Sequence, residues 1–540
     1  MESIRIERLD HLGVIASVIK DLGLIDMINA RLVPDAQEAL TPGEAVAGMI
    51  LNGLGFANRP LSLTPQFFAN KPLDLLFHEG LEAEHFNRFK LGRTLDEAYT
   101  YGCDALFQEL ALAVCAQEGI DQRFNHLDTT SFSLTGEYVP DSDEHAILIT
   151  HGYSKDHRPD LKQVVLELMV SQDGGVPCVS KSWDGNTSDI HVFQERAQAL
   201  LTAFAHTPSP RYLVADAKLY HADNATHLKP MGFITRIPNT LSVVSQVIRQ
   251  ALEWETWHPV DDNIRYQRLE LCHYGMAQRW LVVYSQAAFE RAAARLKKAT
   301  QRKEEAITKT LFHLQAQRFP TPEAAHNALA AVAQRWQYHQ LESSQLTEPP
   351  RYAAKGRPTP RTPRKASTWQ IQAHVRPADE VIKDLQHVQA CYVLGTNISA
   401  SELSDPAAIA AYKNPSRVEG GFRLLKDPLF FVSSLFVKKP SRIEGLLMVM
   451  TLALLVYSVT QRRLRQPLAA HHQTVPNQIH QPTTSPTLRW VFQLLDGIHR
   501  VQVTVQGHLH DRIESLTNLQ INILRLFGNA VCHLYQISPG

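Results

Sequence analysis

An apolar, β-branched run at residues 164–170 constrains the fold of the middle of this chain more than any other feature. It ends in the turn-forming residues 171–175, and a second short apolar run follows at residues 176–180. Two such runs joined by a glycine-rich turn predict a β-hairpin. Further strand patterns at residues 212–215 and 233–237, with a helical pattern before the first of them, predict a mixed α/β sheet.

The length of 540 residues is too great for one hydrophobic core, so we expect about three or four domains. Changes in pattern along the chain suggest their boundaries. We predict a helical N-terminal domain (1–120), the first part of an α/β core (121–240), an insertion domain (241–390), the second part of the core (391–465), and a C-terminal linker and helical region (466–540).

The N-terminal domain contains a clear helix start. Thr41 is the expected N-cap, Pro42 the first helical residue and Glu44 the acid that completes a capping box. Helical N-terminal domains often read DNA, but the same pattern also fits a plain helical bundle. Both interpretations stay open at this point.

The insertion domain shows a second hairpin pattern at residues 264–284 and two helical stretches in residues 286–340, broken at 319–322. A basic segment, residues 351–365, follows with six basic residues, three prolines and no acid. Such a segment suits DNA phosphates and a minor groove, which makes Arg357, Arg361 and Lys365 candidate DNA-binding residues. The alternative is a solvated linker.

Composition narrows the class of protein without choosing a function. The 54 basic and 54 acidic residues cancel, so an argument for nucleic acid depends on local patches. The six cysteines are scattered without a Cys-x-x-Cys pair, and the N-terminus has no signal-peptide pattern, which together predict a cytoplasmic protein. The apolar run at residues 445–459 is shorter than the ~20 residues of a membrane span and predicts a buried core helix.

Three carboxylates stand in contexts suited to a divalent metal ion. Asp128 lies in an apolar-edged polar run, Asp216 ends the strand pattern at 212–215, and Glu419 lies in a helical run from 414 to 426. Two acids at strand ends and one on a helix can converge on a pair of magnesium ions, which prefer oxygen ligands and can clamp a phosphodiester. The alternative is three unrelated surface or capping carboxylates.

Helix starts are also expected near the last of these acids. Asp405 is the predicted cap of one helix, with Pro406 in its first turn, and Pro415 begins another. Glu419, Phe422, Arg423 and Lys426 then share one helix face. That face can hold a metal ligand and a phosphate contact side by side, although a surface ion pair fits it too.

Several motifs occur together and in a recognisable order. They are residues 126–132 around the first aspartate, 152–163 before the hairpin, and 213–220 around the second aspartate. Tyr412, Glu419 and Lys426 then follow with a characteristic spacing. In these features the chain resembles the DDE transposases of bacterial insertion sequences, in the cut-and-paste superfamily with a Tyr-Arg-Glu-Lys signature. The signature's arginine position holds Pro415, and Arg417 lies two residues further on.

The resemblance implies an RNase H-like mixed-sheet catalytic core, interrupted by a β-rich and helical insertion where the hairpin at 264–284 is predicted. It implies that Asp128, Asp216 and Glu419 are catalytic and hold Mg²⁺, with Mn²⁺ as a substitute. It further implies that Tyr412, Arg417 and Lys426 contact DNA phosphates.

The function implied is cutting and joining of insertion-sequence ends by a homodimer acting on double-stranded DNA, in the cytoplasm at the nucleoid. Two alternatives remain: a catalytically inactive DNA-binding derivative that regulates transposition, and an RNase H-like nuclease. In the C-terminal region, an apolar helical run at residues 519–537 is expected to serve dimerisation or simple packing.

Overall fold

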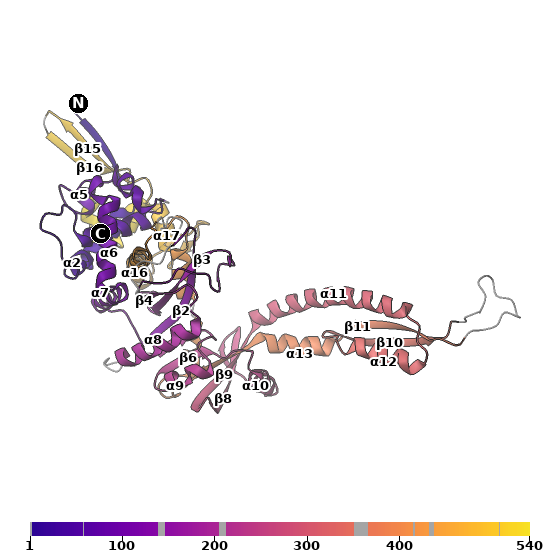
Figure 1. Cartoon of the computed structure of the whole chain (residues 1–540). Coiled ribbons are helices and arrows are strands. Elements are labelled where there is room, and N and C mark those ends of the chain that lie inside the picture. Colours follow the sequence, from indigo (N-terminus) through magenta and orange to yellow (C-terminus); the bar gives the residue numbers. More distant parts are fainter. Residues whose placement is uncertain are drawn as a thin grey trace, which may run out of the picture. The chain divides into compact units, whose positions relative to one another are not determined.

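The computed structural model describes residues 3–57, 59–138, 146–204, 212–349, 366–413, 416–430, 437–506 and 508–539. The chain divides into two compact units, whose elements are labelled in Figure 1. Unit 1 comprises residues 1–235 and 400–540, and unit 2 comprises residues 236–399. Unit 1 therefore contains all three carboxylates singled out in the sequence.

The sheet of unit 1 begins as an antiparallel meander and continues with parallel strands. Its strands are β2 (Phe124–Leu134), β3 (Lys162–Ser171), β4 (Pro177–Trp183), β5 (Tyr212–Ala215) and β6 (Gly232–Arg236). Strand β3 pairs antiparallel with both β2 and β4, whereas β5 pairs parallel with β2, and β6 parallel with β5. The order within unit 1 is β4-β3-β2-β5-β6. The predicted hairpin at 164–180 and mixed α/β fold are confirmed.

Helices cover both faces of the meander. Opposed residues of paired strands share a face, so Asp128, Leu168 and Ser180 lie on one face. Helix α16 (Pro440–Ala470) packs on that face, where Ser180 Oγ lies 3.1 Å from Thr451 Oγ1. Helix α8 (Asp189–Phe204) packs on the other, where Arg196 pairs with Glu167.

Helix α16 is the predicted core helix, and that prediction is confirmed. By length and composition it is apolar enough to cross a membrane, but 94% of its most apolar 18-residue window is buried inside the protein. It packs against helices of the N-terminal region as well as against β4. Its hydrophobicity is therefore explained by its place in the core.

The N-terminal region is helical, as predicted. Its elements are α1 (Leu12–Asp21), α2 (Leu24–Asn29), α3 (Pro42–Leu54), η1 (Leu61–Leu63), α4 (Thr64–Phe68), α5 (Leu73–Leu76), η2 (Ala83–Phe86), α6 (Arg88–Tyr101) and α7 (Cys103–Gln117). Thr41 and Glu44 form the predicted capping box at the start of α3. One strand was not expected there: β1 (Ser3–Arg8) pairs antiparallel with β15 (His499–Val505).

The C-terminal region folds onto this N-terminal region. Its elements are β13 (Val475–Pro476), β14 (Pro482–Thr483), α17 (Leu488–Leu494), β15, β16 (His508–Glu514), α18 (Asn518–Arg525) and α19 (Asn529–Leu534). The prediction of one helical run at 519–537 is wrong, because Gly528 with φ 93° separates α18 from α19. The Tyr535 hydroxyl donates to the carbonyl oxygen of Asp10 at 2.5 Å, so this end of the chain packs within unit 1.

Unit 2 combines a small antiparallel sheet with a helical layer and a two-stranded ribbon. Its elements are α10 (Ser242–Leu252), β7 (His258–Asp261), β8 (Ile264–His273), β9 (Met276–Ser285), α11 (Gln286–Ala316), α12 (Pro322–Ala333), β10 (His339–Thr347), β11 (Gln370–Pro377), α13 (Asp379–Ala390) and β12 (Cys391–Thr396). The hairpin predicted at 264–284 is confirmed as β8 and β9. The second predicted helix is shorter than expected, since it ends at Ala333.

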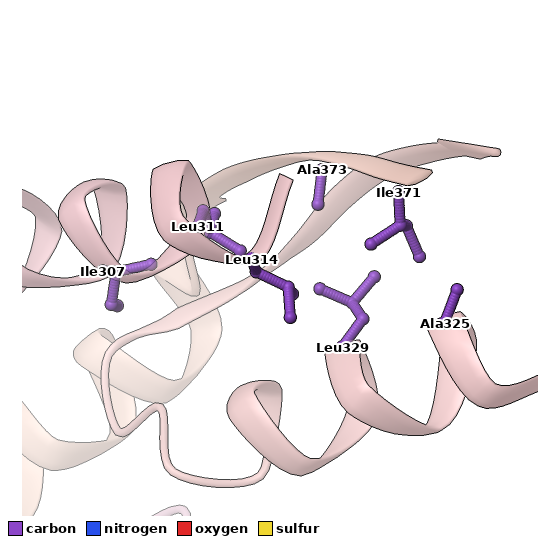
Figure 2. Close-up of a cluster of buried hydrophobic side chains, with 7 residues drawn as sticks. All are labelled: Ile307, Leu311, Leu314, Ala325, Leu329, Ile371 and Ala373. Atoms are coloured by element: carbon purple, nitrogen blue, oxygen red, sulfur yellow. The ribbon is translucent and has the colours of Figure 1, made fainter. Parts of the chain in front are cut away.

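A separate hydrophobic cluster holds α11, α12 and the β10–β11 ribbon of unit 2 together. Leu311 and Leu314 of α11, Leu329 of α12 and Ile371 of β11 meet there (Figure 2). Each of these side chains is at most 6% exposed. Because apolar side chains from two helices and a strand converge, this part of unit 2 has a small core of its own.

Two helices precede α16 and position the third candidate carboxylate. They are α14 (Asp405–Tyr412) and α15 (Ser416–Leu425). The N-cap of α14 is Ser404, whose side chain accepts a hydrogen bond from the Ala407 amide, so the predicted cap at Asp405 is one residue late. Lys426 lies just beyond the last residue of α15, although its amide still donates to the carbonyl oxygen of Phe422 at 2.9 Å.

The remaining short elements connect β5 to β6. They are η3 (Ala222–Asn224) and α9 (Ala225–Leu228).

Candidate active site

Asp128 and Asp216 are neighbours across two parallel strands. The last paired residues of β2 and β5 are Leu127 and Ala215, and each aspartate is the next residue of its chain. Adjacent strands lie about 4.8 Å apart, so the two backbones carry these acids side by side. Strand β5 ends at Ala215, so Asp216 lies at the carboxyl end of a parallel strand, as predicted, whereas Asp128 lies within β2, which continues to Leu134, and the prediction of a strand end there is wrong. Crevices at such strand ends commonly bind ligands.

The electrostatic environment of Asp128 disfavours its charged form. The pKa of Asp128 is raised to about 6: burial is the largest cause, and the nearby Asp216 and Asp189 carboxylates also raise it, against the lowering effect of Lys155 and of the Thr129 amide. That amide donates to Asp128 Oδ1 at 2.7 Å. A cation placed among these carboxylates would relieve their mutual repulsion.

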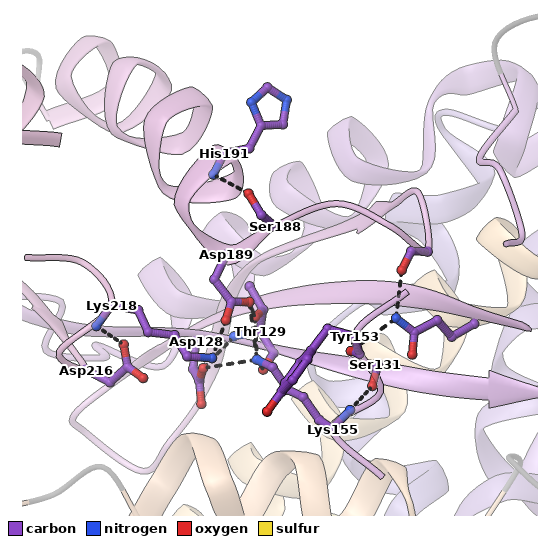
Figure 3. Close-up of polar contacts among 12 residues, drawn as sticks. Asp128, Thr129, Ser131, Tyr153, Lys155, Ser188, Asp189, His191, Asp216 and Lys218 are labelled. Atoms are coloured by element: carbon purple, nitrogen blue, oxygen red, sulfur yellow. Dashed lines mark hydrogen bonds and ion pairs between the residues drawn. The ribbon is translucent and has the colours of Figure 1, made fainter. Parts of the chain in front are cut away.

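Asp189, at the start of α8, is a third aspartate that sequence reasoning did not single out. Its carboxylate accepts hydrogen bonds from the Thr129 hydroxyl and from Lys218 (Figure 3). Burial raises the pKa of Asp189, but those two bonds and the charge of Lys155 outweigh burial, and the net pKa is lowered. An acid before a helical pattern is usually interpreted as a helix-start signal, so no local pattern predicted Asp189 at this site.

Two lysines complete the cluster. Lys155 Nζ lies 3.3 Å from Asp189 Oδ1 and 3.9 Å from Asp128 Oδ1, and it donates to the carbonyl oxygen of Thr129 at 2.5 Å. Lys218 pairs with Asp189, and its own amide donates to Asp216 Oδ1 at 2.9 Å. Burial lowers the pKa of Lys218, but the pair with Asp189 outweighs burial and raises it. Both lysines lie within the motifs at 152–163 and 213–220.

Helix α15, which carries Glu419, packs on the sheet face that carries Asp128. A Cβ atom on Gly421 would lie 3.4 Å from Leu168 Cδ2, and Leu168 is paired with Asp128. At the other end of the helix, Lys426 Nζ lies 5.6 Å from the ring centre of Phe132, four residues from Asp128 and on the same face. Glu419 itself is exposed on this helix.

The described side chains do not form a complete set of metal ligands. In the parts of the chain that the structure describes, no three His, Cys, Asp or Glu side chains are grouped as metal ligands. Asp128 and Asp216 are brought together, and Lys155 and Lys218 pair with the neighbouring Asp189, whereas no described contact joins Glu419 to either aspartate.

The structure describes only some of the remaining predicted site residues, which are the candidate DNA contacts. Tyr412 ends α14 and is half-buried, and Lys426 forms a 2.6 Å ion pair with Asp156 Oδ1. Arg417 lies in the first turn of α15, where only the backbone is described. Arg357, Arg361 and Lys365 lie outside the described residues.

Two glycines allow the segment that carries Lys155 to approach β3 closely. A Cβ atom on Gly185 would lie 2.0 Å from the carbonyl oxygen of Gln163 and 2.6 Å from that of Thr150, both backbone atoms that cannot swing aside. A Cβ atom on Gly152 would lie 2.1 Å from the carbonyl oxygen of Gly185. Both positions therefore require glycine, because a residue with a Cβ atom would clash with the neighbouring backbone.

Gly185→Ala is expected to lower the free energy of unfolding by about 1–3 kcal/mol, because the added methyl group must displace backbone. Urea denaturation of the purified variant measures it. Gly420→Ala is the matched control, since its Cβ atom would meet nothing within 4 Å in the described structure and alanine favours a helix. Equal stabilities of the two variants would contradict the expected clash.

Comparison with known proteins gives three findings. Residues 4–112 match a family described as a domain of unknown function (DUF4277). No curated protein matches the chain. Among solved structures, the chain is similar to a piggyBac transposase synaptic complex with hairpin DNA, at 8% sequence identity and a TM-score of 0.35, covering 90% of this chain and 80% of that chain.

Proposed function

We propose that this protein is a DNA transposase that cuts and joins the ends of an insertion sequence by metal-dependent phosphoryl transfer. The observation that carries the proposal is the placement of Asp128, within β2, beside Asp216, directly after β5, where the parallel pairing of these two strands stops. The helix that carries Glu419 lies on the same sheet face as Asp128. These are the three acids on which the resemblance to DDE transposases depends.

The sheet of unit 1 supports an RNase H-like core. Three antiparallel strands in chain order, followed by two strands parallel to the first, give the order β4-β3-β2-β5-β6. This mixed sheet, with Asp128 on its first strand and Asp216 directly after its fourth, fits the core that the resemblance implies. Unit 2, residues 236–399, falls between the second aspartate and the glutamate, where the resemblance implies an insertion.

The donor set suits magnesium, with manganese as a substitute. Asp128, Asp216 and Glu419 would hold the ions, because Mg²⁺ prefers carboxylate oxygens. Burial is the main cause of the raised pKa of Asp128, and the neighbouring carboxylates of Asp216 and Asp189 also raise it. When bound, the metal would supply activation of a water or a DNA 3′-hydroxyl and stabilisation of the leaving oxygen. Lys155 and Lys218 balance the charge of the carboxylate cluster through Asp189.

The second proposed role of the protein is to bind DNA and hold it in position for the reaction. Tyr412, Arg417 and Lys426 would contact phosphates near the cut, and Arg357, Arg361 and Lys365 would contact phosphates further away. Positioning is central because phosphoryl transfer needs little covalent chemistry from the protein.

We further propose the setting in which this chemistry occurs. The partners would be double-stranded element ends and target DNA. The protein would act as a homodimer in the complex and would work in the cytoplasm at the nucleoid.

Magnesium binding is expected to weaken as the pH falls through about 6. The pKa of Asp128 is raised from its ordinary value to about 6, so below that pH the carboxyl group is protonated and must lose a proton to bind metal. Affinity should then fall up to about tenfold per pH unit, whereas an aspartate of ordinary pKa would change little between pH 5 and 7.

Isothermal titration of Mg²⁺ into the full-length protein at pH 5, 6 and 7 measures this dependence. Asp128→Asn, which removes the titrating group, is expected to bind weakly at every pH. Equal affinity of the unmodified protein at pH 5 and 7 would show that Mg²⁺ binding does not depend on a carboxyl group of raised pKa, and unchanged affinity of Asp128→Asn would show that Asp128 is not a ligand.

An end cleavage and joining assay tests the proposed function. Purified protein is incubated with Mg²⁺ and duplex DNA carrying both ends that flank its own gene. Cleavage at the ends followed by joined products supports a transposase. Cleavage without joining would indicate a nuclease, and end binding without cleavage would indicate a regulator of transposition.

A further inference from the structure

A cavity of about 490 Å³ opens in unit 1 beside the helix that carries Glu419. It lies among α15, α16, the start of α17 and the β3–β4 turn. Its polar lining is supplied by Arg423, Arg465, Arg489, Tyr457, Gln461 and Thr487. We call it the arginine pocket. Its volume falls within the ~300–1,000 Å³ of typical ligand sites.

The pocket carries more positive than negative charge. Three arginines line it, and Asp427 is the one acidic residue in the lining that the structure describes. Asp427 lies 3.7 Å from Arg489, so its charge is directed at that arginine. Arg423 is exposed, and no described side chain forms an ion pair or hydrogen bond with it. An anion in the pocket would therefore meet uncompensated guanidinium charge.

Two of the arginines are held in place by the fold. The Arg489 guanidinium lies 3.4 Å from the ring centre of Phe56, and its backbone amide donates to the Tyr457 hydroxyl at 3.0 Å. Burial lowers the pKa of Arg489 despite the nearby Asp427. Arg465 Nε donates to the carbonyl oxygen of Pro486 at 2.8 Å, which orients the side chain. Preorganised donors of this kind bind anions without losing much conformational freedom.

Glycines leave part of the pocket wall as bare backbone. Gly174 and Gly175 form the β3–β4 turn with φ values of 82° and 68°. Gly420 faces open space, because a Cβ atom there would meet nothing within 4 Å in the described structure. A ligand can therefore approach α15 closely at a position adjacent to Glu419.

We infer that the arginine pocket binds a phosphate group of the DNA backbone. Guanidinium groups pair with phosphate through two parallel hydrogen bonds, and a duplex presents phosphates at regular spacing along each strand. The inference rests on the proposed function, since it takes DNA as the ligand. It adds a phosphate contact at Arg423, on the side of α15 that also carries Gly420, next to the glutamate.

The salt dependence of DNA binding tests this inference. The full-length protein is titrated with duplex carrying its flanking ends at about 50–200 mM salt, and log K is plotted against log salt concentration. Arg423→Gln is expected to reduce the slope by about 1, the value for one lost phosphate contact, and Arg423→Lys to restore it. Arg525→Gln, an exposed arginine on α18, removes the same charge elsewhere and should leave the slope unchanged.

The other outcomes separate this inference from the proposed function. If the unmodified protein binds the ends but Arg423→Gln and Arg525→Gln give the same slope, the pocket does not hold DNA phosphate and the proposed function is untouched. If the unmodified protein binds no DNA, both fail. If inorganic phosphate stabilises the unmodified protein more than Arg423→Gln while the DNA slopes agree, the ligand is free phosphate and the inference is overturned.

Discussion

Glu419→Gln is expected to slow cleavage of the element ends by roughly 10²–10³-fold, the loss seen when one electrostatic stabiliser of a transition state is removed. Glutamine keeps the size of the side chain and loses the negative charge that a metal ion requires. Glu419 is exposed on α15 and makes no described contact that supports the fold, so stability should not change. Cleavage rates under single-turnover conditions, with saturating Mg²⁺, measure the effect.

Binding to the element ends separates this result from a general loss of function. Glu419→Gln should bind the ends as tightly as the unmodified protein in the absence of metal, because the phosphate contacts remain. Glu514→Gln, at an exposed position on β16, is the matched control and should cut at the normal rate. Normal cleavage by Glu419→Gln would remove the glutamate from the proposed metal site.

Arg196→Leu is expected to lower the free energy of unfolding by about 3–5 kcal/mol, because it leaves a buried carboxylate without its cation. Glu167 on β3 is completely buried, and Arg196 Nε lies 2.5 Å from its Oε1. Trp183 Nε1 also donates to Glu167, at 2.9 Å. The network joins α8, which begins at Asp189, to the sheet, so its loss should also loosen the carboxylate cluster. Chemical denaturation gives the stability change.

A double variant distinguishes the buried charge from lost packing. Arg196→Leu combined with Glu167→Leu removes both charges and should recover most of the stability lost in the single variant. Arg158→Leu, at a fully exposed ion pair with Asp160, should leave stability unchanged. If the double variant were as unstable as Arg196→Leu alone, the loss would come from packing.

Elements with strong local signals could be predicted from the sequence. The hairpins at 164–180 and 264–284 are confirmed because alternation and turn residues determine them locally. The strand predicted at 212–215 is confirmed as β5, and Asp216 follows it directly. The capping box of Thr41 and Glu44 could also be predicted, because its two residues are only three positions apart in the sequence.

Elements determined by distant partners could not be predicted. Strand β1 pairs Ile4 with Val503, and no local pattern reports a partner so far along the chain. Lys155 precedes the β3–β4 hairpin in the sequence and Asp189 follows it, so only the folded chain brings the two side chains into an ion pair. The separation of α18 from α19 depends on the single residue Gly528 within an otherwise apolar helical pattern. Of the candidate site, Asp216 was predicted at a strand end and does follow β5, whereas Asp128 was predicted at one and lies within β2. The lysines and Asp189 needed the structure.

Anomalous diffraction from crystals of the full-length protein grown with Mn²⁺ tests the central claim most directly. The account predicts an anomalous peak bound by the carboxylates of Asp128 and Asp216, with Glu419 drawn toward it and Lys155 displaced from Asp128. The peak should be absent in crystals of Asp128→Asn. Mn²⁺ bound only elsewhere, with Lys155 and Lys218 still paired with Asp189 and Glu419 still exposed, would contradict a metal-dependent active site at these residues.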